Sequence, residues 1–193
     1  MLRRILLTAL LVSTASIDAK TPAADPLATL KQNDQILQDM LRRFPKESIS
    51  TNDSLKHHLS VMFGFGELGK RALGKSWVKQ SKPDQDTFQL DFSKMVEKTA
   101  LQSPQDYLSD SSKSVLSGKP NNEATIITTV YRGSSQVIIT YKLYQDAGAW
   151  RVYDLKVGDK PSQVEKYRNQ FTQYLAKKTF KELLATIKKN AGT

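Results

Sequence analysis

Between residues 25 and 100 the apolar residues recur every three or four positions, the spacing of one face of an α-helix. A first helix is predicted from Asp25 to just before Pro45, because proline stops a helix. A second is predicted with Ser50 or Thr51 as its N-cap, and a third with Pro83 near its start. The predicted core faces are Leu30, Leu37, Leu41 and Phe44, then Leu55, Leu59, Met62 and Phe63, then Phe88, Phe92, Met95 and Val96. The glycine-rich stretch at residues 64–74 predicts a broken or closely packed helical segment that ends near Trp77.

The period changes to two in the next part of the chain, which is typical of strands. Strands are predicted at Val115–Leu116 and over residues 123–131, 136–144 and 149–157, joined by short turn-like segments. Alternation along the third strand gives Val137, Ile139, Tyr141 and Leu143 a common face. In the last strand, alternation places Asp154 with Trp150 and Val152, opposite Tyr153 and Leu155.

Two helical patterns close the chain. The first starts near Pro161 and is predicted to bury Val164, Tyr167, Phe171 and Tyr174 or Leu175; the second is predicted to bury Phe180, Leu183, Leu184 and Ile187. The order of elements predicts an α+β fold, an antiparallel meander sheet of three to five strands wrapped by N- and C-terminal helices. We expect one domain over residues 25–190.

The N-terminus has the parts of a secretory signal peptide. Two arginines are followed by an almost entirely apolar run over residues 5–12 and then by small and polar residues. This run is too short to cross a bilayer, which takes about 20 apolar residues. We therefore predict a signal peptide over residues 1–19, cleaved after Ala19 or alternatively after Ala15, and a polar leader over residues 20–24. The alternative for this segment is a buried N-terminal helix.

Charge and composition narrow the choice of partners. The chain has no cysteine, so the exported protein must be stable through its core, without disulfides or a cysteine-linked lipid. Its formal net charge is +10, and residues 20–193 keep +9 because residues 1–19 hold two basic residues and one acidic. This charge favours anionic lipid headgroups or acidic proteins, and export makes nucleic acid the least suitable partner. The last two helices are strongly basic, which indicates either a solvated face or a docking surface for such partners.

Few residues have the pattern of a catalytic or metal site. His57 and His58 are adjacent on a predicted helix, so they point in different directions and are expected to be solvated surface residues. Residues 69–76 match the letters of a nucleotide-binding P-loop. A working P-loop follows a buried strand and opens a helix, whereas here the preceding pattern is helical and Pro83 follows soon after. We expect the match to be accidental, and the protein not to be an enzyme.

Short motifs in the C-terminal third are the most specific feature. A strand reads WRVYD at residues 150–154, and the next helix contains YRNQF at residues 167–171. Upstream, a Leu-Gly pair at residues 73–74 is followed by Trp77 and by a phenylalanine-rich helix. In this order the motifs resemble the MlaC family, also called the toluene-tolerance family, of periplasmic phospholipid-binding proteins. The chain departs from the family pattern in the loop at residues 157–162, which lacks the usual apolar position, and in lacking the usual Asp before the Leu-Gly pair.

The resemblance implies a lipid carrier without a cofactor or metal. Family members are thought to pass phospholipid between an outer-membrane lipoprotein complex and an inner-membrane ABC transporter with an MCE-domain protein, which maintains outer-membrane lipid asymmetry. It also implies transient contact with membrane surfaces. The candidate pocket residues are Phe63, Leu68, Leu73, Trp77, Phe88, Phe92, Val137, Ile139, Tyr141, Leu143, Trp150, Val152 and Tyr153. The candidate structural residues of the motifs are Gly74, Asp154, Tyr167, Arg168 and Phe171.

A second interpretation of the same residues is open. The apolar side chains also suit an ordinary filled core, in which case the chain is an exported interaction or scaffold protein of the same fold. Bound phospholipid in purified protein distinguishes the two.

Overall fold

The computed structural model describes residues 25–43, 52–100, 107–118 and 121–192. Its first half consists of α1 (Pro26–Arg43), α2 (Asp53–Met62), α3 (Phe65–Leu73), the 3-10 helix η2 (Gly74–Lys79) and α4 (Lys82–Ala100). Its second half consists of β1 (Ser111–Ser117), β2 (Glu123–Arg132), β3 (Ser135–Asp146), β4 (Ala149–Val157), α5 (Gln163–Leu175) and α6 (Phe180–Ala191). The predicted signal peptide, the leader, Phe44 and Pro45 lie outside the described residues.

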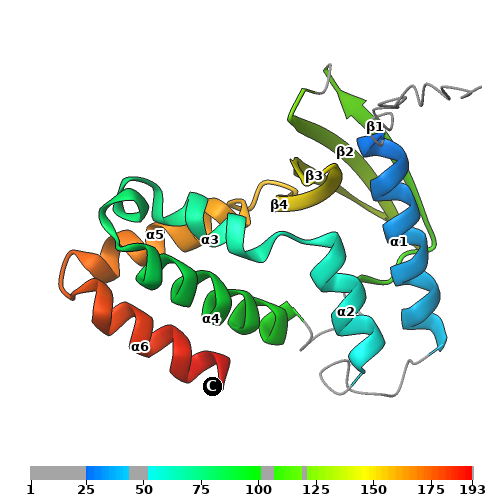
Figure 1. Ribbon diagram of the computed structural model, residues 1–193. Helices are drawn as coiled ribbons and strands as arrows, with labels where there is room; N and C mark the ends of the chain where they lie inside the picture. The colour runs from blue at the N-terminus through cyan, green and yellow to red at the C-terminus, as the bar shows by residue number, and fades with distance from the viewer. Residues whose placement is uncertain (1–24, 44–51, 101–106, 119–120, 193) are drawn as a thin grey trace, which may run out of the picture.

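The four strands form one antiparallel sheet in the order β1-β2-β3-β4. Each strand pairs with its neighbour in sequence, so the predicted α+β fold with a meander sheet is confirmed. Figure 1 shows α1 lying against the sheet, while α3, α4, α5 and α6 gather at the other end of the molecule. None of the described helices is long and apolar enough to cross a membrane.

One face of the sheet, here called the inner face, packs against α1 and α2. Its buried cluster is Leu30, Met62, Ala124, Ile126, Leu143, Trp150 and Val152. A neighbouring cluster of Leu37, Leu41, Leu55 and Leu59 joins α1 to α2. The apolar residues whose spacing predicted these two helices therefore cover the sheet and hold the helices together.

The other core, here called the helical end, is built mainly by α3, α4, α5 and α6. Phe88 and Phe92 of α4 are fully buried and stack with ring centroids 5.3 Å apart. Tyr167 of α5 meets the Phe92 ring edge-on at 4.9 Å. A Cβ at Gly69 of α3 would lie 2.6 Å from Phe92 and 2.8 Å from Phe88, so only glycine lets α3 approach α4 this closely.

The segment Phe63–Gly64 joins the two ends of the molecule. Phe63 forms a parallel bridge with Val152, and Gly64 N donates to the Val152 carbonyl over 2.8 Å. The Phe63 side chain packs against the inner-face cluster, the α1–α2 cluster and the helical end. One partly buried aromatic ring thus contacts all three.

The structure corrects three local predictions. The N-cap of α2 is Asn52, whose side chain accepts from Leu55 N, rather than Ser50 or Thr51. His58 is not a solvated surface residue, because it is 8% exposed with its Nε2 2.8 Å from the Asn33 carbonyl.

The third correction concerns the faces of β4. Lys142 pairs with Asp154 and Leu143 pairs with Val152, so Tyr153 is an extra residue that forms a β-bulge. The bulge reverses the alternation, so the Asp154 side chain lies on the other face of the sheet from Trp150 and Val152, not on the same face as predicted.

Candidate functional site

Asp154 fastens the end of the sheet to the start of α5. Its side chain is 3% exposed, and its Oδ1 accepts a hydrogen bond from Val164 N over 2.9 Å. Lys142 Nζ lies 3.8 Å from the other carboxylate oxygen. Because the first N–H groups of a helix have no partner within it, this carboxylate satisfies one of them. The Asp of the WRVYD motif therefore has a positional role.

Tyr153, the bulged residue, carries a second set of contacts between sheet and helices. The Arg71 guanidinium lies 3.7 Å from the centre of the Tyr153 ring, and the Tyr153 hydroxyl donates to Glu123 Oε2 over 3.3 Å. Arg71 Nη2 donates to Glu123 Oε1 over 2.7 Å, which lowers the pKa of Glu123. Arg168 of the YRNQF motif reaches the Arg71 carbonyl at 3.0 Å. These contacts join α3, β2, β4 and α5.

Most of the predicted pocket residues fall into two separate buried clusters. Leu68, Leu73, Trp77, Phe88, Phe92 and Tyr153 belong to the helical end, together with Tyr167 and Phe171. Leu143, Trp150, Val152 and Tyr141 belong to the inner face, and Phe63 lies between the two groups. Gly74 is exposed at the start of η2. Leu68, Leu73, Phe88 and Phe92 lie away from the Val137–Leu143 face, which α1 and α2 cover at its Leu143 end.

The helices α1 and α2 cover only part of the inner face. Leu143, Ile126 and Val152 are at most 1% exposed, whereas Val137 near the β2–β3 turn is 39% exposed. Strand pairing puts Val130 opposite Val137 and Val157 opposite Ile139. We call these four residues the apolar end of the inner face; except for Val137, they are half-buried. This part of the sheet has aliphatic side chains available to a ligand.

Residues 107–109, which precede β1, are held against α1 beside this region. Gln38 of α1 is buried; its Nε2 donates to the Tyr107 carbonyl at 2.7 Å, and its Oε1 accepts from Ser109 N at 3.0 Å. Arg42 Nη2 donates to the Ser109 carbonyl at 2.8 Å. Burial raises the pKa of Asp34, one turn before Gln38. The segment is fixed by polar contacts at the margin of an apolar face.

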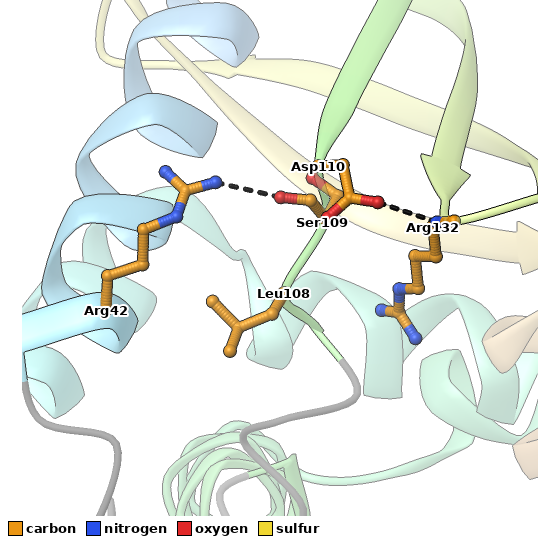
Figure 2. A pocket seen from close by; sticks show the side chains of 6 residues that line it. Arg42, Leu108, Ser109, Asp110 and Arg132 are labelled. Atoms are coloured by element: carbon orange, nitrogen blue, oxygen red, sulfur yellow. Dashed lines mark hydrogen bonds between the residues drawn. The ribbon is translucent and has the colours of Figure 1, made fainter.

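A hollow of about 600 Å³ opens at this margin. It is lined by Arg42, Leu108, Ser109, Asp110, Arg132 and Gly133. Figure 2 shows Arg42 and Arg132 on opposite sides of Leu108, with Asp110 bonded toward the β2–β3 turn. The sequence pattern singled out neither arginine, because only the fold brings α1 to the end of β2. The one available signal was alternation, which places Arg132 on the same face as Val130.

The described residues contain no group of three or more side chains suited to hold a metal ion. Residues 69–76 run from α3 into η2, with helix rather than strand before them. A P-loop needs a strand that delivers the loop to a helix N-terminus, so the local structure does not suit one.

Comparisons with known proteins point to one family. The family model described as MlaC protein matches residues 28–189. The fold is similar to the phospholipid-binding protein from Ralstonia solanacearum, solved in complex with a phospholipid, with a TM-score of 0.70 and 17% identity. This likeness covers 88% of this chain and 98% of that chain. No curated protein matches the sequence.

Proposed function

The chain belongs to the MlaC family, and we propose that it binds a phospholipid and carries it through the periplasm. The observation that carries the proposal is the likeness, over nearly the whole length of both chains, to a protein solved with a phospholipid bound. A binding protein rather than an enzyme fits this relationship.

An acyl chain needs an apolar surface that the protein does not fill itself. Removing a methylene from water stabilises the bound lipid by about 0.8 kcal/mol, so even part of a chain contributes several kcal/mol. The apolar end of the inner face supplies such a surface. The helical end does not, because its aromatic rings already contact one another. We therefore propose that an acyl chain lies along Val137 and Ile139.

The proposal also includes a role in lipid transport. We propose export by the signal peptide and transfer of lipid between an outer-membrane lipoprotein complex and an inner-membrane ABC transporter with an MCE-domain protein. The basic residues of α5 and α6 would meet acidic partners or anionic membrane surfaces during transient contact. The positive net charge of the chain supports this direction of charge complementarity.

Lipid analysis of the purified protein tests the proposal. The exported protein should carry extractable phospholipid, and native mass spectrometry should show the corresponding mass. Protein stripped of lipid and incubated with phospholipid vesicles should regain that mass, which serves as the control for loss during purification. Protein that stays lipid-free in both preparations would favour the scaffold interpretation.

A further inference from the structure

We propose that the hollow between α1 and the β2–β3 turn binds the phosphate group of the lipid, with Arg42 and Arg132 on either side of it. This inference rests on the proposed function, and it assigns the orientation of the ligand: phosphate in the hollow, and an acyl chain on the apolar end of the inner face.

Two guanidinium groups lie at this hollow. Arg42 comes from the last turn of α1 and Arg132 from the last position of β2, and both line the same hollow. Figure 2 shows their side chains flanking Leu108. Guanidinium groups bind phosphate oxygens through paired N–H donors, and two of them around one hollow can neutralise a phosphodiester.

Arg42 is held in position, and it keeps N–H donors for an anion. Its Nη2 donates to the Ser109 carbonyl at 2.8 Å, and its Nη1 lies 3.9 Å from Asp39 Oδ1. A guanidinium has five N–H donors, so a bond to one carbonyl leaves others for an anion. The carboxylate that lines the hollow, Asp110, accepts from Gly133 N through its Oδ2 at 2.6 Å, and so contributes to the shape of the turn.

The hollow is adjacent to the apolar end of the inner face. Arg132 follows Val130 by two residues on the same face of β2, and Val130 pairs with Val137. The hollow therefore lies next to the apolar end along β2. A ligand that joins a phosphate to long alkyl chains matches this arrangement, whereas free phosphate would use the hollow alone.

The test compares two probes with the same acyl chains, of which only one carries a phosphate-containing headgroup. Pyrene-labelled phosphatidylglycerol and pyrene-labelled diacylglycerol with the same chains are titrated into the mature protein and into Arg42→Gln, Arg132→Gln and the double variant. Each single substitution should weaken phosphatidylglycerol binding by about ten-fold, the value of one charged hydrogen bond. Binding of diacylglycerol should stay within about two-fold of the parent. Arg43→Gln, an exposed neighbour that does not line the hollow, is the matched control and should bind both probes like the parent.

Several outcomes would overturn the inference. Equal binding of phosphatidylglycerol by the double variant and the parent would do so, as would equal losses with both probes. Inorganic phosphate that binds the parent in an arginine-dependent way, without competing with phosphatidylglycerol, would make the hollow a site for free phosphate. A parent that binds neither probe would instead contradict the proposed function. Circular dichroism melting of each variant separates loss of binding from loss of fold.

Discussion

The two ends of this molecule use apolar residues in different ways. At the helical end, α3, α4, α5 and α6 close around Phe88 and Phe92, which have no exposed surface. At the sheet end, α1 and α2 bury Leu143 and Val152 but leave Val137 39% exposed, although it lies on the same face of the same sheet. The helical end is a filled core, whereas the core at the sheet end does not extend to the β2–β3 turn.

This contrast bears on where a lipid site is expected. Aromatic residues in motifs draw attention first, yet here they fill space and fasten helices. The aliphatic residues on the inner face at the turn end of β2 and β3 form no conspicuous motif, and they are left partly uncovered. If this contrast is right, substitutions at the two ends should separate stability from lipid binding.

The largest effect is expected from Phe92→Ala. Removing a fully buried ring leaves a cavity among Phe88, Tyr167 and Phe171, and should cost about 3–5 kcal/mol of unfolding free energy. Chemical denaturation measures the loss. Lipid bound per folded molecule should not change, and a selective loss of lipid without destabilisation would show that the helical end is part of the lipid site.

A pair of enlarging substitutions gives the sharpest contrast. Val96→Trp, in the helical end, should overpack the core and lower the free energy of unfolding by about 1–3 kcal/mol. Val137→Trp has room at the surface, so it should leave the melting temperature nearly unchanged but reduce co-purified phospholipid. Melting temperature and extracted lipid are measured on the same samples. A large drop in melting temperature for Val137→Trp would mean that the sheet end is filled as well.

A smaller, pH-dependent effect is expected at the start of α6. Glu182 and the N-cap Thr179 form a capping box, and hydrogen bonds from Thr179 lower the pKa of Glu182 from 4.5 to about 2. A lowered folded-state pKa gives stability that is present above pH 4.5 and is lost as the pH falls toward 2. Thr179→Ala should lower the free energy of unfolding by about 1 kcal/mol at neutral pH. The difference in stability between parent and Glu182→Gln should shrink as the pH falls through this window.

No effect is expected from Lys75→Ala. Lys75 is exposed in η2, away from both cores, and the P-loop match around it has the wrong local structure. Lipid content and melting temperature should both equal those of the parent. ATP binding that disappears in this variant would contradict the assignment.

Sequence periodicity predicted the elements well but not their partners. The helical spacing of Leu30, Leu37 and Leu41 predicts a helix with one apolar face, and nothing in that spacing says which face of which element it meets. The bulge at Tyr153 was missed because alternation assumes a regular ladder, and one added residue reverses every later side chain. The burial of His58 depends on the Asn33 carbonyl of another helix. The arginine hollow was missed for the same reason, since its walls come from distant parts of the chain.

The bridge between Phe63 and Val152 also bears on self-association. A sheet with an open strand edge invites pairing with another copy, and proteins usually protect such edges. Here the Phe63–Gly64 segment occupies part of the outer edge of β4, where Gly64 N donates a hydrogen bond to the Val152 carbonyl. The opposite edge strand, β1, is the shortest of the four strands and carries Lys113 among serines, which disfavours growth of the sheet. A chain that leaves aliphatic surface uncovered at one end of its sheet thereby keeps both edges of that sheet poor templates for aggregation.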